Sequence, residues 1–195
     1  MVNPIGRGAA DNPASRFLPI LVEADYEQME FDEEFLSELE RPKTTYFDDT
    51  SMSIISENDS PDVPFQYSLN PYRGCLHGCS YCYARLSHEY LGFSAGLDFE
   101  QKILVKKNAP QLLRKFLMHP KWDATPIMLS GNTDCYQPIE STLGLTRACL
   151  DVCAEYRNPV GIITKGVIVA RDLDLLTQLH EQAWIRVYFS IAFAD

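Results

Sequence analysis

Short apolar runs alternate with amphipathic stretches from residue 65 to the end of the sequence. Runs of four to seven mostly apolar residues, several of them rich in β-branched side chains, predict strands, which we expect at residues 65–69, 102–106, 126–130, 160–164 and 185–191. Apolar residues that recur at intervals of three and four predict helices at residues 83–90, 109–118, 142–156 and 172–182. This alternation predicts an α/β fold with a parallel sheet and crossover helices.

Polar or cysteine-containing segments follow several of the predicted strands. In parallel α/β sheets the carboxyl ends of the strands carry the functional groups, so we expect these segments to lie along one edge. An alternative interpretation is that Asn132 and Asp134 are turn residues and Ser190 is an ordinary strand serine. The segments are the cysteine-containing loop after residue 69, Ser130-Gly-Asn-Thr-Asp134, Thr164-Lys165 and Ser190.

Charge divides the chain into two parts. Residues 1–62 contain 15 acidic and 4 basic side chains, whereas residues 63–195 contain 12 acidic and 13 basic ones. We interpret residues 1–60, with the acidic run 23–40, as a weakly ordered arm, and we expect residues 1–55 to be dispensable for the chemistry of the rest. Residues 61–195 are the predicted folded domain, whose near-neutral charge gives no support for binding nucleic acid.

Targeting signals do not stand out in the sequence. No apolar run approaches the length of a membrane span, and the first 16 residues lack the apolar region of a signal peptide, so we expect a cytoplasmic protein with no membrane partner. In that compartment six cysteines are not expected to form a disulfide framework. Cys149 and Cys153, four apart on one predicted helix, are expected to be buried as small apolar side chains.

The most informative motif is a cysteine loop. Cys75, Cys79 and Cys82 have the spacing Cys-x3-Cys-x2-Cys, and Gly74 and Gly78 allow the tight turns that such a loop needs. Three thiolates can hold three irons of a four-iron cluster. The fourth iron then has no protein ligand, and a substrate can coordinate there.

A zinc site is the alternative interpretation of the same cysteines. His77 or His88 would then complete the ligand set. Zinc sites usually contain two Cys-x2-Cys pairs, and this loop contains one, so the cluster is the favoured hypothesis.

The cysteine spacing, with Tyr81 just before the third cysteine, resembles the cluster loop of radical S-adenosylmethionine (radical SAM) enzymes. Other motifs resemble the spore photoproduct lyase-like group of that superfamily, whose members are often labelled DNA repair photolyases. The resemblance implies a partial (β/α) barrel of six units, of which this chain covers about the first four strands before a C-terminal truncation. The motifs are Asn70-Pro-Tyr-Arg-Gly-Cys75, Tyr81-Cys-Tyr-Ala-Arg85, Thr133-Asp134, Tyr136-Gln-Pro-Ile-Glu140, Thr164-Lys165 and Arg171-Asp172.

The resemblance implies two cofactors, a [4Fe-4S] cluster on Cys75, Cys79 and Cys82 and S-adenosylmethionine on its open iron. An electron from a flavodoxin- or ferredoxin-type partner would cleave S-adenosylmethionine to a 5′-deoxyadenosyl radical, which abstracts hydrogen from a substrate. The residues implied to contact S-adenosylmethionine are Ser130, Gly131, Asn132, Thr133 and Asp134 at its amino group, Lys165 at its carboxylate, and Ser190 at its ribose or carboxylate.

One departure from the group concerns the hydrogen donor. Spore photoproduct lyases use a cysteine near the second strand end, where this chain has Gly131, and Cys135 is the candidate donor four residues on. The substrate is therefore unassigned, and DNA is a candidate without support from charge. Three hypotheses stay open: a radical SAM enzyme, a non-catalytic cluster-binding fragment of one, and a structural zinc module.

Overall fold

The computed structural model describes residues 6–9, 12–13, 15–17 and 43–191. Their contacts define two compact units. The cysteine-loop unit lies within Met1–Phe47 and Arg73–Leu104, and the sheet unit within Asp48–Tyr72 and Val105–Asp195. The acidic run at residues 23–40 falls outside the described residues.

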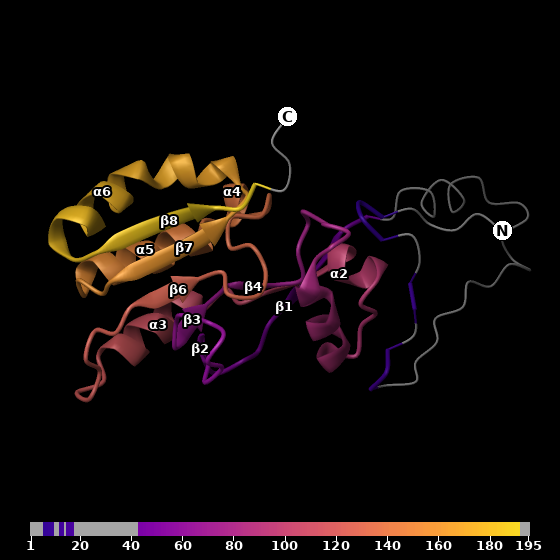
Figure 1. Ribbon diagram of the computed structural model, residues 1–195, viewed down its shortest axis with the longest axis horizontal. Helices are drawn as coiled ribbons and strands as arrows, with labels where there is room; N and C mark the ends of the chain where they lie inside the picture. Colours follow the sequence, from indigo (N-terminus) through magenta and orange to yellow (C-terminus); the bar gives the residue numbers. More distant parts are fainter. Residues whose placement is uncertain (1–5, 10–11, 14, 18–42, 192–195) are drawn as a thin grey trace, which may run out of the picture. The chain divides into compact units, whose positions relative to one another are not determined.

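The sheet unit contains a five-stranded sheet in the order β2-β3-β6-β7-β8 (Figure 1). Strands β3, β6, β7 and β8 are parallel, and β2 pairs antiparallel with β3. The predicted α/β fold with a parallel sheet is confirmed. Among the described residues the sheet is open, with β2 and β8 as its edges. The strands are β2 (Ile55–Glu57), β3 (Tyr67–Leu69), β6 (Ile127–Leu129), β7 (Val160–Thr164) and β8 (Ile185–Phe189).

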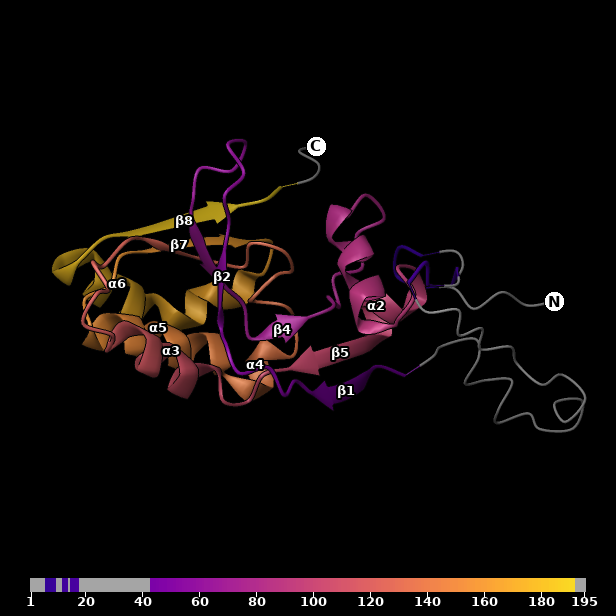
Figure 2. The same cartoon turned by 90° about the horizontal axis from the view of Figure 1, so that it is seen from below.

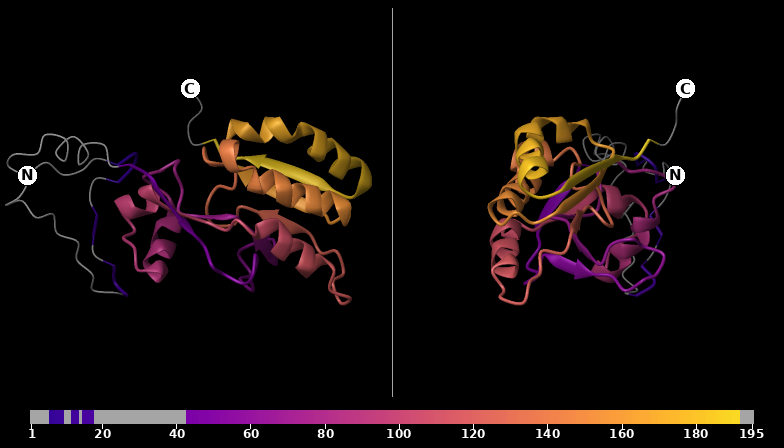
Figure 3. Two further views of the ribbon diagram at one scale, coloured as in Figure 1. Left: turned by 180° about the vertical axis from the view of Figure 1, so that it is seen from behind. Right: turned by 60° about the vertical axis from the view of Figure 1, so that its left-hand side comes forward.

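Three helices cover one side of this sheet (Figure 2). They are α3 (Ala109–Leu117), α5 (Leu145–Glu155) and α6 (Leu173–Gln182), and the chain reverses after α6 to return beside it as β8 (Figure 3). No helix among the described residues is long and apolar enough to cross a membrane.

The helix expected at residues 142–156 is divided in two. Gly144 has a φ of +62°, a left-handed conformation that favours glycine, and it separates α4 (Glu140–Leu143) from α5. The 3₁₀ helix η3 (Val167–Asp172) precedes α6 and was missed because its short apolar run lacks a clear period.

The core lies between the sheet and its helices. Alternate residues of β6 and β7 point toward the helices and are fully buried, as the two-residue period of a strand requires. Cys149 and Cys153 are fully buried in the same core, as predicted, and burial raises the pKa of Cys153 to about 12. The central buried residues are Leu113, Ile127, Leu129, Leu150, Val160, Ile162 and Leu179.

The cysteine-loop unit contains the 3₁₀ helix η2 (Tyr83–Leu91), expected as a helix, and α2 (Leu97–Gln101), which was not expected. A second sheet has the order β1-β5-β4. Its strands are β1 (Thr45–Asp48), β4 (Tyr72–Arg73) and β5 (Lys102–Val105).

The structure describes part of the range 1–60, which the sequence predicts to be a weakly ordered arm. Strands β1 and β2 lie within this range, and among the described residues near the N-terminus Gly8 contacts Glu100 of α2 (Figure 2). Local composition misleads here because the partners are distant in sequence. The ring of Phe47 lies 5.8 Å from that of Phe93, and the ring of Phe17 stacks at 4.8 Å on that of Tyr90.

Replacing Leu150 with Ala should lower the free energy of unfolding of the sheet unit by about 2–5 kcal/mol, because it leaves a cavity at a fully buried position. Leu173→Ala is the matched control, since Leu173 is 65% exposed, and it should change stability by less than about 0.5 kcal/mol. Both tryptophans, Trp122 and Trp184, belong to this unit, so urea titration followed by tryptophan fluorescence reports on it. Equal midpoints for the two variants would contradict the described core.

Candidate functional site

The residues predicted to bind S-adenosylmethionine meet at one edge of the sheet. Segment 130–134 follows β6, Lys165 follows β7 and Ser190 follows β8, and the three strands are parallel neighbours. These residues therefore lie at the carboxyl ends of adjacent strands, which is the predicted location.

Asp134 joins two of these strand ends. One carboxylate oxygen accepts hydrogen bonds from the hydroxyl of Thr164 at 2.7 Å and the backbone NH of Tyr136 at 2.8 Å. The other accepts from the backbone NH of Lys165 at 2.7 Å. The carboxylate thus fixes the end of β7 against the segment after β6, and its role in the structure is to position Lys165.

Lys165 and Ser190 contact each other directly. The ammonium group of Lys165 donates to the hydroxyl oxygen of Ser190 at 2.8 Å. The backbone NH of Ser190 donates to the carbonyl of Thr164 at 2.9 Å, which continues the pairing of β7 and β8 past the end of β8. A cation and a hydroxyl group therefore lie together at this edge, a combination that can hold a carboxylate.

The turn after β6 has an unusual backbone. Ser130 has a φ of +93°, which is rare for a residue with a side chain, and Gly131 follows with +69°. The Ser130 hydroxyl stabilises the turn by donating to the carbonyl of Ile163 at 2.5 Å and accepting from the NH of Cys135 at 3.1 Å. Strained residues of this kind cluster at ligand sites, and here one sits at the predicted edge.

Asn70 and Thr133 extend the site to β3. The Asn70 amide donates to the carbonyl and the hydroxyl oxygen of Thr133 at 2.5 and 2.9 Å, and that hydroxyl donates to the carbonyl of Tyr72 at 2.9 Å. Sequence reasoning noted Asn70 within a motif and gave it no role. Its position directly after a strand was the available signal.

A buried ion-pair network lies below this edge, and sequence reasoning gave it no role either. Glu140 is fully buried and accepts hydrogen bonds from the hydroxyl of Tyr72 at 2.5 Å and from Arg171 at 2.8 Å. Asp172, also fully buried, accepts from Arg171 at 2.7 Å, Arg147 at 3.0 Å and the hydroxyl of Tyr136 at 2.9 Å.

The network keeps Asp172 ionised. Burial on its own would raise the pKa of Asp172, but the hydrogen bonds from Arg171, Arg147 and Tyr136 outweigh it and hold the pKa below its ordinary value. The pKa of Tyr72 is raised, chiefly by burial and then by the charge of Glu140. These groups join α4, α5 and η3 through buried ion pairs.

The sheet face opposite the helices contains a cavity of about 660 Å³. Met128, Gly161 and Ile163 alternate with the core-facing residues of β6 and β7 and line it, and Ser190 lies at its rim. A mostly apolar cavity beside a few polar groups is the usual form of a small-molecule site.

In the cysteine-loop unit, the backbone bends sharply around the three predicted ligands. Gly74 and Gly78 have φ values of +79° and +60°, and the NH of Gly78 donates to the carbonyl of Cys75 at 3.2 Å. Cys75 is 6% exposed and packs against Ala84 and Phe99, with the partly buried Cys82 against the same cluster. Cys79 is half-buried.

The described residues contain no group of three or more His, Cys, Asp or Glu side chains already arranged as metal ligands. The loop therefore brings the three cysteines into one unit without closing them into a ligand set. His88, named in the zinc alternative, is fully buried beside Phe93 and Phe99 and donates from its Nε2 to the carbonyl of Lys102 at 3.0 Å.

Cys135, the candidate hydrogen donor, is fully buried in the core of the sheet unit. Burial raises the pKa of its thiol well above the ordinary value. The core of the sheet unit therefore encloses this thiol, and the donor role of Cys135 stays a prediction.

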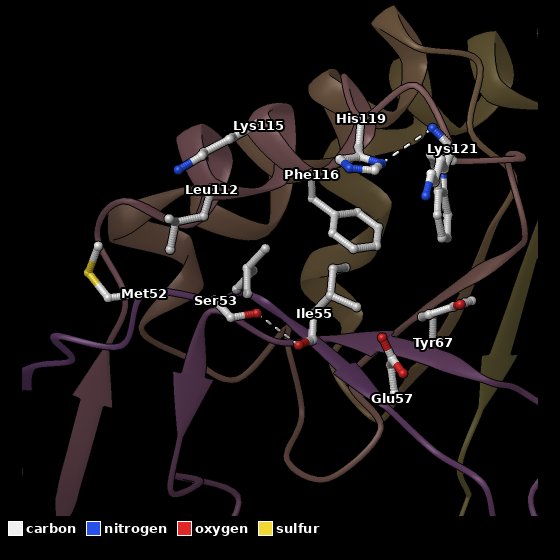
Figure 4. A pocket seen from close by; sticks show the side chains of 12 residues that line it. Met52, Ser53, Ile55, Glu57, Tyr67, Leu112, Lys115, Phe116, His119 and Lys121 are labelled. Carbon is white, nitrogen blue, oxygen red and sulfur yellow. Dashed lines mark hydrogen bonds between the residues drawn. The ribbon is translucent and has the colours of Figure 1, made fainter.

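A second cavity of about 430 Å³ lies between α3 and strands β2 and β3 (Figure 4). Phe116 points into it from the helix above Ile55, and the rings of Tyr67 and Trp122 lie 5.0 Å apart at its wall. Tyr67 begins β3, so the cavity lies away from the carboxyl edge, and none of the residues predicted as a site lines it.

Comparison with known proteins finds relatives of unassigned function. An uncharacterized protein of Mycobacterium tuberculosis (strain ATCC 25618 / H37Rv) is 40% identical over 133 residues, which cover 68% of this chain and 39% of the relative. An uncharacterized protein of Methanocaldococcus jannaschii is 34% identical over 110 residues, covering 56% of this chain and 39% of the relative. An uncharacterized protein of Acidianus two-tailed virus is 27% identical over 126 residues, which cover 62% of this chain and 41% of the relative. The chain thus spans about two fifths of the length of the curated relatives it matches, and no protein-family model and no solved structure matches it.

His88 should make the stability of the cysteine-loop unit depend on pH. Burial lowers its pKa from 6.5 to about 4, so between these values the unfolded chain binds a proton that the folded unit does not. Stability should therefore be full above pH 6.5 and should fall by roughly 2–4 kcal/mol as the pH drops to about 4. Hydrogen exchange of peptides from residues 83–104 measures this loss.

His88→Gln should remove most of that pH dependence, and the exposed His119→Gln should retain it. The difference between the two variants isolates His88 from the carboxylates that titrate in the same range. Parallel pH profiles for the two variants would contradict a neutral buried imidazole.

Proposed function

We propose that this chain binds a [4Fe-4S] cluster and S-adenosylmethionine as a radical SAM protein of unassigned substrate. The observation that carries the proposal is the loop with three cysteines at Cys-x3-Cys-x2-Cys spacing, which provides three ligands for four irons. The four parallel strands with helices on one face support the finer proposal that the sheet belongs to a partial (β/α) barrel.

The donor groups and their surroundings fit such a cluster. Three thiols are the ligand type that iron–sulfur clusters take, and the apolar cluster around Cys75 and Cys82 provides a site of low polarity. Cys75, Cys79 and Cys82 would hold the cluster, which supplies the electron that cleaves S-adenosylmethionine to a 5′-deoxyadenosyl radical. A flavodoxin- or ferredoxin-type protein would be the reducing partner.

The sheet edge would bind S-adenosylmethionine through its polar groups. The ammonium group of Lys165, which donates to the hydroxyl of Ser190, would pair with the methionyl carboxylate, and that hydroxyl would contact the ribose or the same carboxylate. Segment 130–134 would contact the methionyl amine. Asp134 contributes by holding the backbone of Lys165 in place, because both of its carboxylate oxygens accept hydrogen bonds from the protein.

The substrate would bind in the cavity on the sheet face opposite the helices. Its lining includes apolar side chains such as Met128 and Ile163, which would contact an apolar part of a substrate next to the strand ends. The substrate class stays open, and DNA is one candidate. A chain that loads the cluster and binds S-adenosylmethionine without cleaving it would be the non-catalytic alternative.

Anaerobic reconstitution with iron and sulfide should yield brown protein with about four irons and four sulfides per chain. Cys79→Ala should abolish loading, because it removes one of three ligands. Cys153→Ala removes a thiol from the core of the sheet unit and should retain loading. Iron and acid-labile sulfide analysis measures both, and purification of a zinc-only protein would show that the cluster proposal is wrong.

S-adenosylmethionine should change the electron paramagnetic resonance spectrum of the reduced cluster, since it binds at the iron without a protein ligand. Lys165→Ala should weaken binding by roughly 1–3 kcal/mol through loss of a charge-assisted hydrogen bond. Lys121→Ala is the matched control, because this exposed lysine precedes β6 at the opposite end of the strand. An unchanged spectrum at saturating S-adenosylmethionine would exclude the open iron.

A further inference from the structure

Within the cysteine-loop unit, the carboxylate of Glu100 connects the described N-terminal residues to residues 73–104. Its side chain is 1% exposed and accepts hydrogen bonds from the backbone NH of Arg7 at 2.5 Å and of Gly8 at 3.1 Å. It also forms an ion pair with Arg85 at 2.6 Å. A buried carboxylate is costly without such partners, so the N-terminal backbone is part of the unit's polar core.

Gly8 lies against the backbone of the cysteine loop. A Cβ atom at position 8 would come within 1.9 Å of the carbonyl oxygen of Gly78 and 2.8 Å of the backbone nitrogen of Ser80. Both obstacles are backbone atoms, which have little room to move. Glycine is therefore required at position 8 for this approach.

Arg85 transmits the same contact to the predicted cluster ligands. Its guanidinium group donates to the carbonyl of Gly78 at 2.9 Å and to that of Cys79 at 3.1 Å. Because Glu100 holds Arg85 and the N-terminal backbone together, these groups form one connected network around the loop.

Three further contacts join the described N-terminal residues to η2 and α2. Asn12 and Asp98 exchange hydrogen bonds of 3.3 and 3.4 Å, and Arg16 pairs with Glu89 at 2.6 Å. The ring of Phe17 stacks on Tyr90.

The result is a cavity of about 380 Å³ beside Cys82. Gly8, Ala9 and Pro13 form one of its walls, and Ser80, Cys82 and Tyr83 are among the residues that complete it. The N-terminal residues thus limit the space next to a predicted cluster ligand.

We propose that Gly6–Ala9 form a strap that fixes the cysteine loop and restricts solvent access to Cys79 and Cys82. The strap acts through Glu100 and Arg85 as a positioning element, and its part in cluster stability rests on the proposed function. Its effect on the loop itself does not, because the contacts join protein groups alone.

Thiol alkylation of the metal-free full-length protein tests the strap directly. With N-ethylmaleimide and peptide mass spectrometry, Gly8→Ala should react roughly ten- to hundredfold faster than the wild type at Cys79 and Cys82, because it opens a charge-assisted contact. Arg7→Ala is the matched control. It loses only the hydrogen bond of 3.3 Å from its guanidinium group to the carbonyl of Glu100 and keeps the backbone NH that binds the Glu100 carboxylate, so it should stay within about twofold of the wild type.

Two internal references separate opening of the strap from unfolding. Cys75 is packed against Phe99 and should stay protected in Gly8→Ala, as should Cys149 and Cys153 in the other unit. If Cys75 also becomes reactive, Asn12→Ala provides the milder test, since it removes only the contact with Asp98. The decisive comparison is between the wild type and the variant in which Cys75 stays protected. If Cys79 and Cys82 are alkylated at the same rate in both proteins, the proposal is overturned.

Reconstituted protein separates this inference from the proposed function. Gly8→Ala should lose its cluster several-fold faster in air and shift its reduction potential, because solvent exposure tunes iron–sulfur potentials, while Arg7→Ala should match the wild type. Faster alkylation without cluster formation in any variant would support the strap and refute the cluster. Clusters of equal air stability and potential in all variants would overturn the strap and leave the cluster intact.

Discussion

Carboxylates buried away from water organise both units. An ionised carboxylate in a protein interior needs opposite charge and several hydrogen bonds to offset its lost hydration. In the cysteine-loop unit Glu100 meets this need with Arg85 and two N-terminal backbone NH groups. In the sheet unit Glu140 and Asp172 share Arg171, so the helices behind the strand ends are locked by charge as well as by apolar packing.

Because β6, β7 and β8 are parallel neighbours, the segments that follow them meet at one edge of the sheet. Successive strands end side by side, and the segments that follow them are joined by short hydrogen bonds through Asp134 and Asn70. The strained turn at Ser130 is held by the Ile163 carbonyl of the neighbouring strand. Groups at this edge would therefore need little reorganisation to bind the proposed ligand, which would favour affinity.

Periodicity was enough to predict the parallel sheet, its crossover helices and the edge where polar residues gather, because each of these depends on local patterns. It could not predict β1, β2 or the ordered N-terminal residues, since Phe47, Ile54 and Gly8 gain their partners from distant parts of the chain. The motif residues Glu140, Arg171 and Asp172 were visible in sequence, but their roles needed three-dimensional pairing. The spacing alone identified Cys75, Cys79 and Cys82 as candidate cluster ligands. It gave no indication that Cys135 is buried.

The contact between Gly8 and Glu100 also has a consequence for biosynthesis. The two residues are 92 positions apart, so Gly8 cannot reach its partner until the 92 residues that follow it have been translated. At roughly 5–20 residues per second this delay lasts about 5–20 seconds. Toward the end of that interval the loop with Cys79 and Cys82 emerges without its cover, and any factor that delivers metal to nascent protein would find the thiols accessible before Gly6–Ala9 close over them.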